Sequence, residues 1–213
     1  AAVSQTGSVA EVADTAMPTV VAITSVSVQE IPNYFRAFGF GYGTQQYSSE
    51  GSGSGIIVGE NDDELLIATN NHVVSGATTL SVCFVGNDVV NAEEETVDMS
   101  GSDGDVNVED AVSAKIKGTD ESNDLAVVAV QKSDIPEDTL SQIKIAQLGN
   151  SDDLQVGEQV VAIGNALGYG QSVTTGIISA LDRSITVNNV TFSGLIMTDA
   201  AINSGNSGGA LLN

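Results

Sequence analysis

Residues 55–84 read GIIVGENDDELLIATNNHVVSGATTLSVCF, and this stretch decides the fold class. Three short runs of apolar and β-branched residues, Gly55 to Val58, Leu65 to Thr69 and Thr79 to Phe84, alternate with polar turn residues. Val, Ile and Thr are favoured in strands, and each run has the length of a strand rather than of a helix. The stretch therefore predicts short β-strands joined by tight connections.

The same pattern continues on both sides of this stretch. The further runs are Thr19 to Val28, Ala111 to Lys117, Leu125 to Val130, Gln159 to Ile163, Gln171 to Ala180, Ser184 to Phe192 and Leu195 to Thr198. Many short strands, 23 glycines and almost no long helical pattern predict an all-β sandwich or barrel. One short helix is expected near the start, because Ser8 can cap it and Glu11 stands three residues later.

Two segments interrupt the strand series. Residues 31–55 contain a proline and many Gly and Ser residues, and we interpret them as a long loop or a lengthened hairpin. Residues 133–147 are polar and lie between two groups of strands. The predicted organisation is a first barrel over residues 1–131, a connection over 132–147 and a second barrel over 148–213.

The charge of the chain excludes several classes of partner. Six Lys and Arg against 28 Asp and Glu give a net charge of −22. So acidic a surface repels phosphate backbones and anionic membrane surfaces, so no nucleic-acid partner is expected. A hydrophobic content of 41% argues against a disordered chain, and no apolar run approaches the ~20 residues of a membrane span.

The chain has one cysteine, Cys83, and one histidine, His72. A single Cys excludes an internal disulfide framework and any multi-Cys metal site, and a single His excludes a site that needs two. Cys83 stands between Val82 and Phe84, and we interpret it as a small buried hydrophobe rather than a reactive thiol.

Residues 86–110 carry nine acidic residues and no Lys or Arg. Their mutual repulsion favours a solvated excursion from the fold. Calcium binding is the alternative, because Asp103, Asp105 and Asn107 match the first three ligand positions of an EF-hand loop. The strict motif fails, since its sixth and twelfth positions lack the required Gly and Glu.

Three pieces of sequence carry candidate chemistry. Near the C-terminus, residues 205–209 read GNSGG, and glycines around Ser207 permit a backbone that gathers N–H groups in one concavity suited to an oxyanion. His72 follows an apolar strand, where a general base can be held rigidly. Asp124 directly precedes another apolar strand, where it can orient an imidazole. The plain alternatives are a glycine-rich turn, a surface His and a turn-forming Asp.

The order of these residues along the chain distinguishes between the known types of serine hydrolase. The order is His72, Asp124, Ser207, as in chymotrypsin-type hydrolases. α/β-Hydrolases need a His after the Ser, and none follows Ser207. Subtilisins need an Asp before the His; Asp62 and Asp63 precede it, but the alternating helices of that fold are missing.

Seven segments in series resemble the HtrA (DegP) family of trypsin-like serine proteases. They are GSGSGII (51–57), ATNNHVV (68–74), NDLAV (123–127), LGNS (148–151), VGEQVVAIGN (156–165), GIISA (176–180) and TDAAINSGNSGGAL (198–211). The similarity runs from Val9 to Asn213, in order and at sensible spacing.

This resemblance implies two chymotrypsin-like six-stranded barrels with the active site between them. By motif, His72 is the general base, Asp124 orients it and Ser207 is the nucleophile. The loop of Gly205, Asn206 and Ser207 would form the oxyanion hole, with the N–H groups coming from Gly205 and Ser207. The resemblance implies no metal and no cofactor.

The resemblance also implies a substrate specificity, an oligomeric state and a cellular location. Ile202 stands where the family lines its S1 pocket, which suggests small aliphatic side chains at the cleaved position. Asp199 is expected to be structural, outside the triad. Family members usually form trimers, lie outside the cytoplasm at the cell surface or in the periplasm, and degrade misfolded proteins. A membrane tether before Ala1 is expected.

Two departures qualify the resemblance. The family continues after the nucleophile with further strands of the second barrel and usually a PDZ domain, whereas this chain stops at Asn213. We therefore expect a second barrel without its last strands, inactive by itself, in a chain that is truncated or cleaved. The acidic segment 86–110 is also longer than the usual loop there, and its role is open.

Three functions compete at this point. The first is an endopeptidase that degrades misfolded extracytoplasmic proteins through Ser207. The second is a protease-like domain that binds client proteins without cutting them, or an incompetent fragment. The third is an acidic β-barrel protein whose Ser-Gly turns are structural. Labelling of Ser207 by a fluorophosphonate separates the first from the others.

Overall fold

The computed structural model describes residues 8–31, 45–84, 111–166, 170–187 and 190–213. Within these residues there are ten strands: β1 Val20–Ile31, β2 Gln45–Glu60, β3 Glu64–Thr69, β4 Thr79–Cys83, β5 Val112–Asp120, β6 Leu125–Gln131, β7 Gln159–Ala166, β8 Gly170–Val187, β9 Val190–Thr198 and β10 Ala210–Leu212. The helices are α1 Val9–Ala16, α2 Asn71–Val74 and α3 Glu137–Gln142, with 3₁₀ turns η1 Met17–Thr19, η3 Lys132–Asp134 and η4 Ser151–Asp153. The all-β fold class is thereby confirmed.

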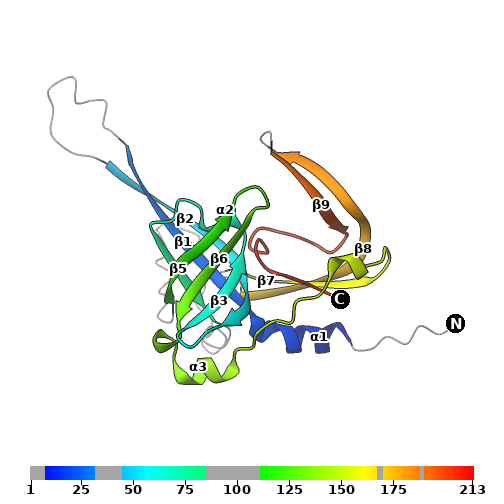
Figure 1. Cartoon of the computed structure of the whole chain (residues 1–213), viewed down its shortest axis with the longest axis horizontal. Helices are drawn as coiled ribbons and strands as arrows, with labels where there is room; N and C mark the ends of the chain where they lie inside the picture. The colour runs from blue at the N-terminus through cyan, green and yellow to red at the C-terminus, as the bar shows by residue number, and fades with distance from the viewer. Residues whose placement is uncertain (1–7, 32–44, 85–110, 167–169, 188–189) are drawn as a thin grey trace, which may run out of the picture.

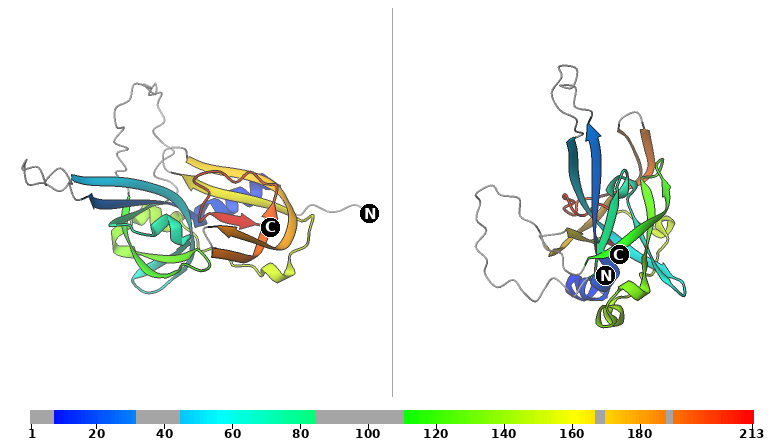
Figure 2. Two further views of the ribbon diagram at one scale, coloured as in Figure 1. Left: turned by 90° about the horizontal axis from the view of Figure 1, so that it is seen from above. Right: turned by 90° about the vertical axis from the view of Figure 1, so that its left-hand side faces the viewer.

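The first six strands close into a barrel in the order β1-β2-β3-β6-β5-β4, with antiparallel neighbours. The remaining strands form a curved four-stranded sheet in the order β10-β7-β8-β9. Barrel and sheet lie side by side, with α1 beneath their junction (Figures 1 and 2). A closed six-stranded barrel beside an open half-barrel matches the predicted chymotrypsin-like architecture.

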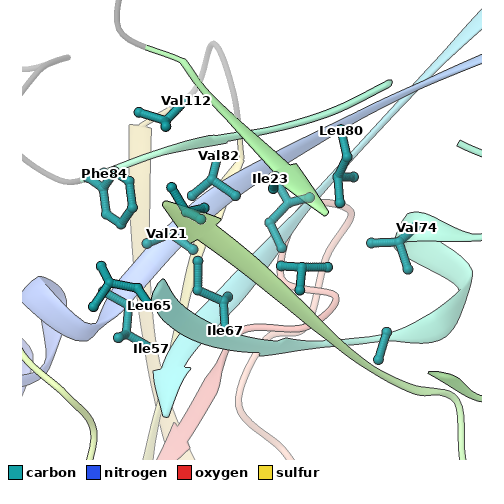
Figure 3. Packing of buried hydrophobic residues seen from close by; sticks show 14 of the residues in the cluster. Val21, Ile23, Ile57, Leu65, Ile67, Val74, Leu80, Val82, Phe84 and Val112 are labelled. Carbon is teal, nitrogen blue, oxygen red and sulfur yellow. The ribbon is translucent and has the colours of Figure 1, made fainter. Parts of the chain in front are cut away.

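The barrel interior is filled by alternate residues of its strands. Along β3, Leu65 and Ile67 are buried while the intervening positions face outward. Their side chains converge with those of Ile23, Ile57 and Phe84 (Figure 3). Gly55 faces this interior, and a Cβ there would lie 2.6 Å from Cγ2 of Ile67, so glycine leaves the room that the core side chains occupy.

A smaller core joins the N-terminal helix to the second sheet. Ala13 of α1 packs with Val161 and Ile163 of β7 and with Val20 of β1. The predicted helix start is confirmed, because the Ser8 hydroxyl accepts from the Glu11 N–H and the Glu11 carboxylate accepts from the Ser8 N–H. This capping box fixes where the chain turns towards the barrel.

The structure refines several local predictions. Within the segment 31–55, Ile31 and residues 45–55 belong to the long pairing of β1 and β2, which runs from Val20↔Ile56 to Ile31↔Gln45 and agrees with the lengthened hairpin, while 32–44 lie outside the described residues. The three runs expected within 171–198 join into two long strands, β8 and β9. β8 continues through Asp182, whose φ of 53° and neighbouring register shifts bend the strand without ending it.

The polar connection also holds structure that sequence reasoning did not anticipate. Within residues 133–147, α3 forms a short helix whose Thr139 is buried. Leu140 and Ile143 pack against the barrel core, so this connection closes the barrel end. Cys83 is buried on β4, as expected of a small hydrophobe.

Truncation of Ile67 is expected to destabilise the barrel strongly. Ile67→Ala removes fully buried methyl groups and leaves a cavity, so the free energy of unfolding should fall by about 2–5 kcal/mol. Ile116→Ala is the matched control on β5 of the same barrel, where the side chain is 43% exposed. This variant should change the free energy of unfolding by less than about 1 kcal/mol. Urea unfolding followed by circular dichroism measures both, and equal losses would contradict the assigned barrel core.

Candidate active site

His72 is carried directly by the wall of the barrel. β3 ends at Thr69, and α2 begins two residues later. Val73 and Val74 of α2 are buried and hold this short helix against the core, as Figure 3 shows for Val74. The His72 side chain remains 57% exposed, so a rigid support presents an accessible imidazole.

Asp124 holds His72 through two hydrogen bonds. Oδ2 of Asp124 lies 2.7 Å from Nδ1 of His72, and Oδ1 accepts a 2.8 Å bond from the His72 backbone N–H. A carboxylate acceptor favours the proton on Nδ1, which leaves Nε2 of the neutral ring as an acceptor. The pair therefore has the orientation and tautomer that a general base needs.

The backbone of Asp124 adopts an uncommon conformation that its neighbours stabilise. Its φ is 52°, in the left-handed region that residues other than glycine seldom adopt. The Asp124 carbonyl accepts one bond from Nδ2 of Asn70, at 2.8 Å, and another from the Asn71 N–H, at 3.1 Å. The turn at the end of β3 thus fixes both the carboxylate and the backbone of Asp124.

A second carboxylate organises the loop that presents Asp124. Oδ1 of Asp120 accepts bonds from the Ser122 hydroxyl and from the N–H groups of Ser122 and Asn123, and Oδ2 accepts from Nδ2 of Asn123. The side-chain bond from Ser122, and then that from Asn123, lower the pKa of Asp120. An ionised Asp120 therefore keeps the turn between β5 and β6 folded.

The loop that carries Ser207 turns on two glycines with positive φ. Gly205 has φ of 99° and Gly208 has φ of 81°. A Cβ on Gly208 would lie 2.2 Å from the Ser54 carbonyl oxygen, so the loop approaches the barrel backbone too closely for any side chain there. This is the physical reason for the glycines on either side of Ser207.

The amides of this loop fall into two groups. The N–H groups of Gly205, which is buried, and of Ser207, which is partly buried, have no acceptor within the described residues. The N–H of Asn206 donates to the Asn203 carbonyl at 3.1 Å, so Asn206 offers no free amide. Its side chain anchors the loop instead, because Oδ1 accepts from the Ser172 hydroxyl at 3.0 Å.

Ser207 lies close to the His72 helix. Gly53 stands between them, since a Cβ there would lie 2.7 Å from Val73 Cγ2 and 3.1 Å from the Ser207 carbonyl oxygen. His72 and Ser207 make no direct hydrogen bond among the described residues. The structure thus joins His72 to Asp124 and brings the backbone of Ser207 alongside.

Asp199 and Ile202 occupy different roles in the segment before Ser207. Oδ1 of Asp199 accepts a 2.7 Å bond from the Ile177 N–H and so fastens the segment to β8, in agreement with a structural role. Ile202 is 58% exposed, and the carbonyl of its neighbour Ala201 accepts from the Thr174 hydroxyl at 2.9 Å. Ile202 is therefore available to contact a bound side chain.

Sequence reasoning did not identify Ser54, Asn70 or Asp120 as parts of this site. Ser54 lies in a Gly-Ser run, Asn70 belongs to a polar turn, and Asp120 stands four residues before Asp124 in no motif. The available signal for Asp120 is its spacing to Ser122 and Asn123, which is typical of an Asx turn.

The other candidate sites, among the described residues, do not bring together a comparable set of catalytic side chains. No three His, Cys, Asp or Glu side chains are placed to share a metal ion in the part of the chain that the structure describes. Residues 86–110, which the calcium alternative concerns, lie outside that part. A hollow of about 510 Å³ lies on the second sheet, between Val160, Ile178 and Leu212, and contains none of the catalytic candidates.

Comparison with known proteins points to one family. Residues 53–213 match the family described as Trypsin-like peptidase domain. The chain is 35% identical over 218 residues to Serine protease Do-like HtrB of Bacillus subtilis, and 35% identical over 238 residues to Periplasmic serine endoprotease DegP of Escherichia coli. The alignments cover 100% and 98% of this chain but only 40% and 44% of those relatives.

Solved structures agree with the sequence relatives. The structure titled HtrA-type protease AlgW with decapeptide superposes with a TM-score of 0.62 at 32% identity, covering 97% of this chain and 56% of that one. Deg5 superposes with a TM-score of 0.60 at 29% identity, covering 96% of this chain and 78% of that one.

Proposed function

The chain belongs to the trypsin-like peptidases of the HtrA (DegP) type, and on that premise we propose that it cleaves polypeptides as a serine endopeptidase through His72, Asp124 and Ser207. The chain spans about 40% of the length of the curated relatives that it matches. One observation carries the proposal: the bidentate contact of Asp124 with the ring and the backbone of His72.

In the proposed reaction, Nε2 of His72 accepts the proton of the Ser207 hydroxyl as Oγ attacks the carbonyl carbon of the scissile peptide bond. The Asp124 carboxylate accepts the hydrogen bond from Nδ1–H of His72 throughout and stabilises the imidazolium that forms. The N–H groups of Gly205 and Ser207 donate to the oxyanion of the tetrahedral intermediate, each contributing about 3–4 kcal/mol to the barrier reduction. The unbonded state of these two amides supports this assignment.

The intermediate then collapses, the C–N bond breaks and the imidazolium protonates the leaving amine. The acyl group stays on Ser207 Oγ as an ester. A water molecule attacks this ester while Nε2 of His72 takes its proton, and a second collapse releases the carboxylate product and restores the Ser207 hydroxyl. The 57% exposure of His72 leaves room for substrate and water at the ring.

The cellular location, substrates and oligomeric state are proposed as well. Several relatives carry "periplasmic" in their names, which supports an extracytoplasmic location for this chain. Misfolded proteins in that compartment are the proposed substrates. A trimer of the full-length protein stays part of the proposal. None of the helices among the described residues is long and apolar enough to cross a membrane, and the tether stays a prediction.

Substrate preference provides a test of the proposed S1 role of Ile202. With Ile202 at the pocket, the full-length protein is expected to cleave after Val, Ala or Ile at least about tenfold more efficiently, in kcat/KM, than after Lys or Asp, because an apolar wall leaves a charged side chain without partners. Mass spectrometry of casein fragments and a panel of matched peptides measures this. Cleavage concentrated after Lys or Arg would overturn the assignment.

A further inference from the structure

Ser54 of β2 connects the barrel, the second sheet and the Ser207 loop. The residue is fully buried. Its N–H donates to the Ser207 carbonyl at 2.7 Å, and its hydroxyl donates to the Gly205 carbonyl at 2.6 Å. The hydroxyl also accepts a 2.7 Å bond from the Asn165 N–H, and the Ser54 carbonyl accepts a 2.7 Å bond from the Thr69 hydroxyl.

These contacts join three parts of the fold that are distant in sequence. Asn165 belongs to β7 of the second sheet, Thr69 ends the strand that precedes His72, and Gly205 belongs to the Ser207 loop. The hydroxyl of Ser54 spans 151 residues to Gly205 and 111 residues to Asn165. One side chain therefore sets how the loop sits against both halves of the protein.

The hydrogen bond from Ser54 to the Gly205 carbonyl bears most directly on the orientation of the Ser207 loop. Glycine has no Cβ to restrict its backbone, and at φ of 99° Gly205 is held from outside. The peptide that joins Gly205 to Asn206 is bonded on both sides: its carbonyl accepts from Ser54 Oγ, and its N–H donates to the Asn203 carbonyl. Rotation of this peptide would break both bonds and displace the Cα atoms of Gly205 and Asn206, from which the neighbouring peptides that carry the Gly205 and Ser207 N–H groups extend.

We propose that Ser54 is a positioning residue, whose buried hydroxyl and backbone N–H orient Gly205 and Ser207 so that their free amides converge on one oxyanion. The inference rests on the proposed peptidase function. It assigns Ser54 no contact with substrate; the residue acts through the Gly205 carbonyl at one end of the loop and the Ser207 carbonyl at the other. A purely structural Ser54 would affect how much protein folds, but not how fast each folded site reacts.

The test separates these two roles by counting active sites. Wild-type, Ser54→Ala and Ser25→Ala forms of the full-length protein are titrated to completion with a fluorophosphonate, and kcat is expressed per labelled Ser207. Ser25 is the matched control, since it is also buried on the barrel wall and donates to Gly51 at 3.3 Å, away from the Ser207 loop.

In Ser54→Ala, kcat per labelled site is expected to fall about 10- to 100-fold with KM within about threefold, because a misdirected oxyanion donor loses part of the 10²–10³-fold effect of a deleted one. Ser25→Ala should stay within about twofold of wild type in both quantities. Ser54→Cys keeps the shape of the side chain with a weaker donor, and an intermediate kcat is expected. If Ser54→Ala does not fold, the cysteine variant carries the test against Ser25→Cys.

The outcomes distinguish this inference from the proposed function. A wild-type protein with no titratable Ser207 would remove the peptidase function itself. A titratable wild type, together with Ser54 variants whose kcat per labelled site stays within about twofold, would overturn the positioning role alone. The positioning role is likewise overturned if activity falls only in proportion to the number of labelled sites.

Discussion

Replacing Ser207 by Ala is expected to lower kcat for peptide hydrolysis by about 10⁵- to 10⁶-fold while leaving the fold intact. The hydroxyl is the proposed nucleophile, and its removal takes away the oxygen on which the acyl ester forms. The Ser207 side chain makes no hydrogen bond within the described residues, so its loss should change the free energy of unfolding by less than about 0.5 kcal/mol. A fluorogenic peptide assay and thermal unfolding measure the two quantities.

Ser204→Ala is the matched control for this variant. Ser204 lies in the same loop three residues earlier, is exposed, and has no assigned role in the chemistry. Its kcat should stay within a few-fold of wild type. Retention of more than about a thousandth of wild-type kcat by the Ser207 variant would place the nucleophile elsewhere.

Asp124→Asn is expected to lower kcat by about 10⁴-fold. The amide can donate to Nδ1 of His72, which then carries no proton, so that the proton moves to Nε2 and the ring can no longer accept from Ser207. Asn tolerates the left-handed backbone at φ of 52°, so the variant should fold. Peptide hydrolysis with a burst-phase measurement shows whether acylation is the slowed step.

Asp182→Asn provides an unusually close control. Asp182 also has a positive φ, of 53°, but lies in β8 rather than beside His72. The same chemical change in the same backbone conformation should leave kcat within about twofold. If Asp124→Asn keeps more than about a tenth of wild-type activity, the His72–Asp124 contact is a structural hydrogen bond rather than a catalytic one.

Local patterns predict the strands well and single out the candidate residues, because both depend on short stretches of sequence. The short apolar run 65–69 predicts β3, and Ser8 with Glu11 predicts the start of α1. The order of His72, Asp124 and Ser207 restricts the arrangement to one fold type before any geometry is known.

The hydrogen bonds that sequence reasoning missed depend on how the folded strands and loops come together in space. Ser54 meets Gly205 only because β2 runs past the second sheet, and nothing in a Gly-Ser run marks which serine will be buried. The Asn206 amide similarly faces Asn203 because of a turn formed by the loop as a whole. Long-range hydrogen bonds of this kind follow from register and strand order, which periodicity alone does not specify.

The proposed mechanism requires that Ser207 is a nucleophile activated by His72. The most direct measurement treats the full-length wild-type protein and its His72→Ala variant with a fluorophosphonate and maps the adduct by peptide mass spectrometry. We expect one phosphonyl group on Ser207 of the wild type, and labelling slowed by at least about a thousandfold in the variant. An adduct on another residue, or equal labelling rates of Ser207 in the two proteins, would contradict this mechanism.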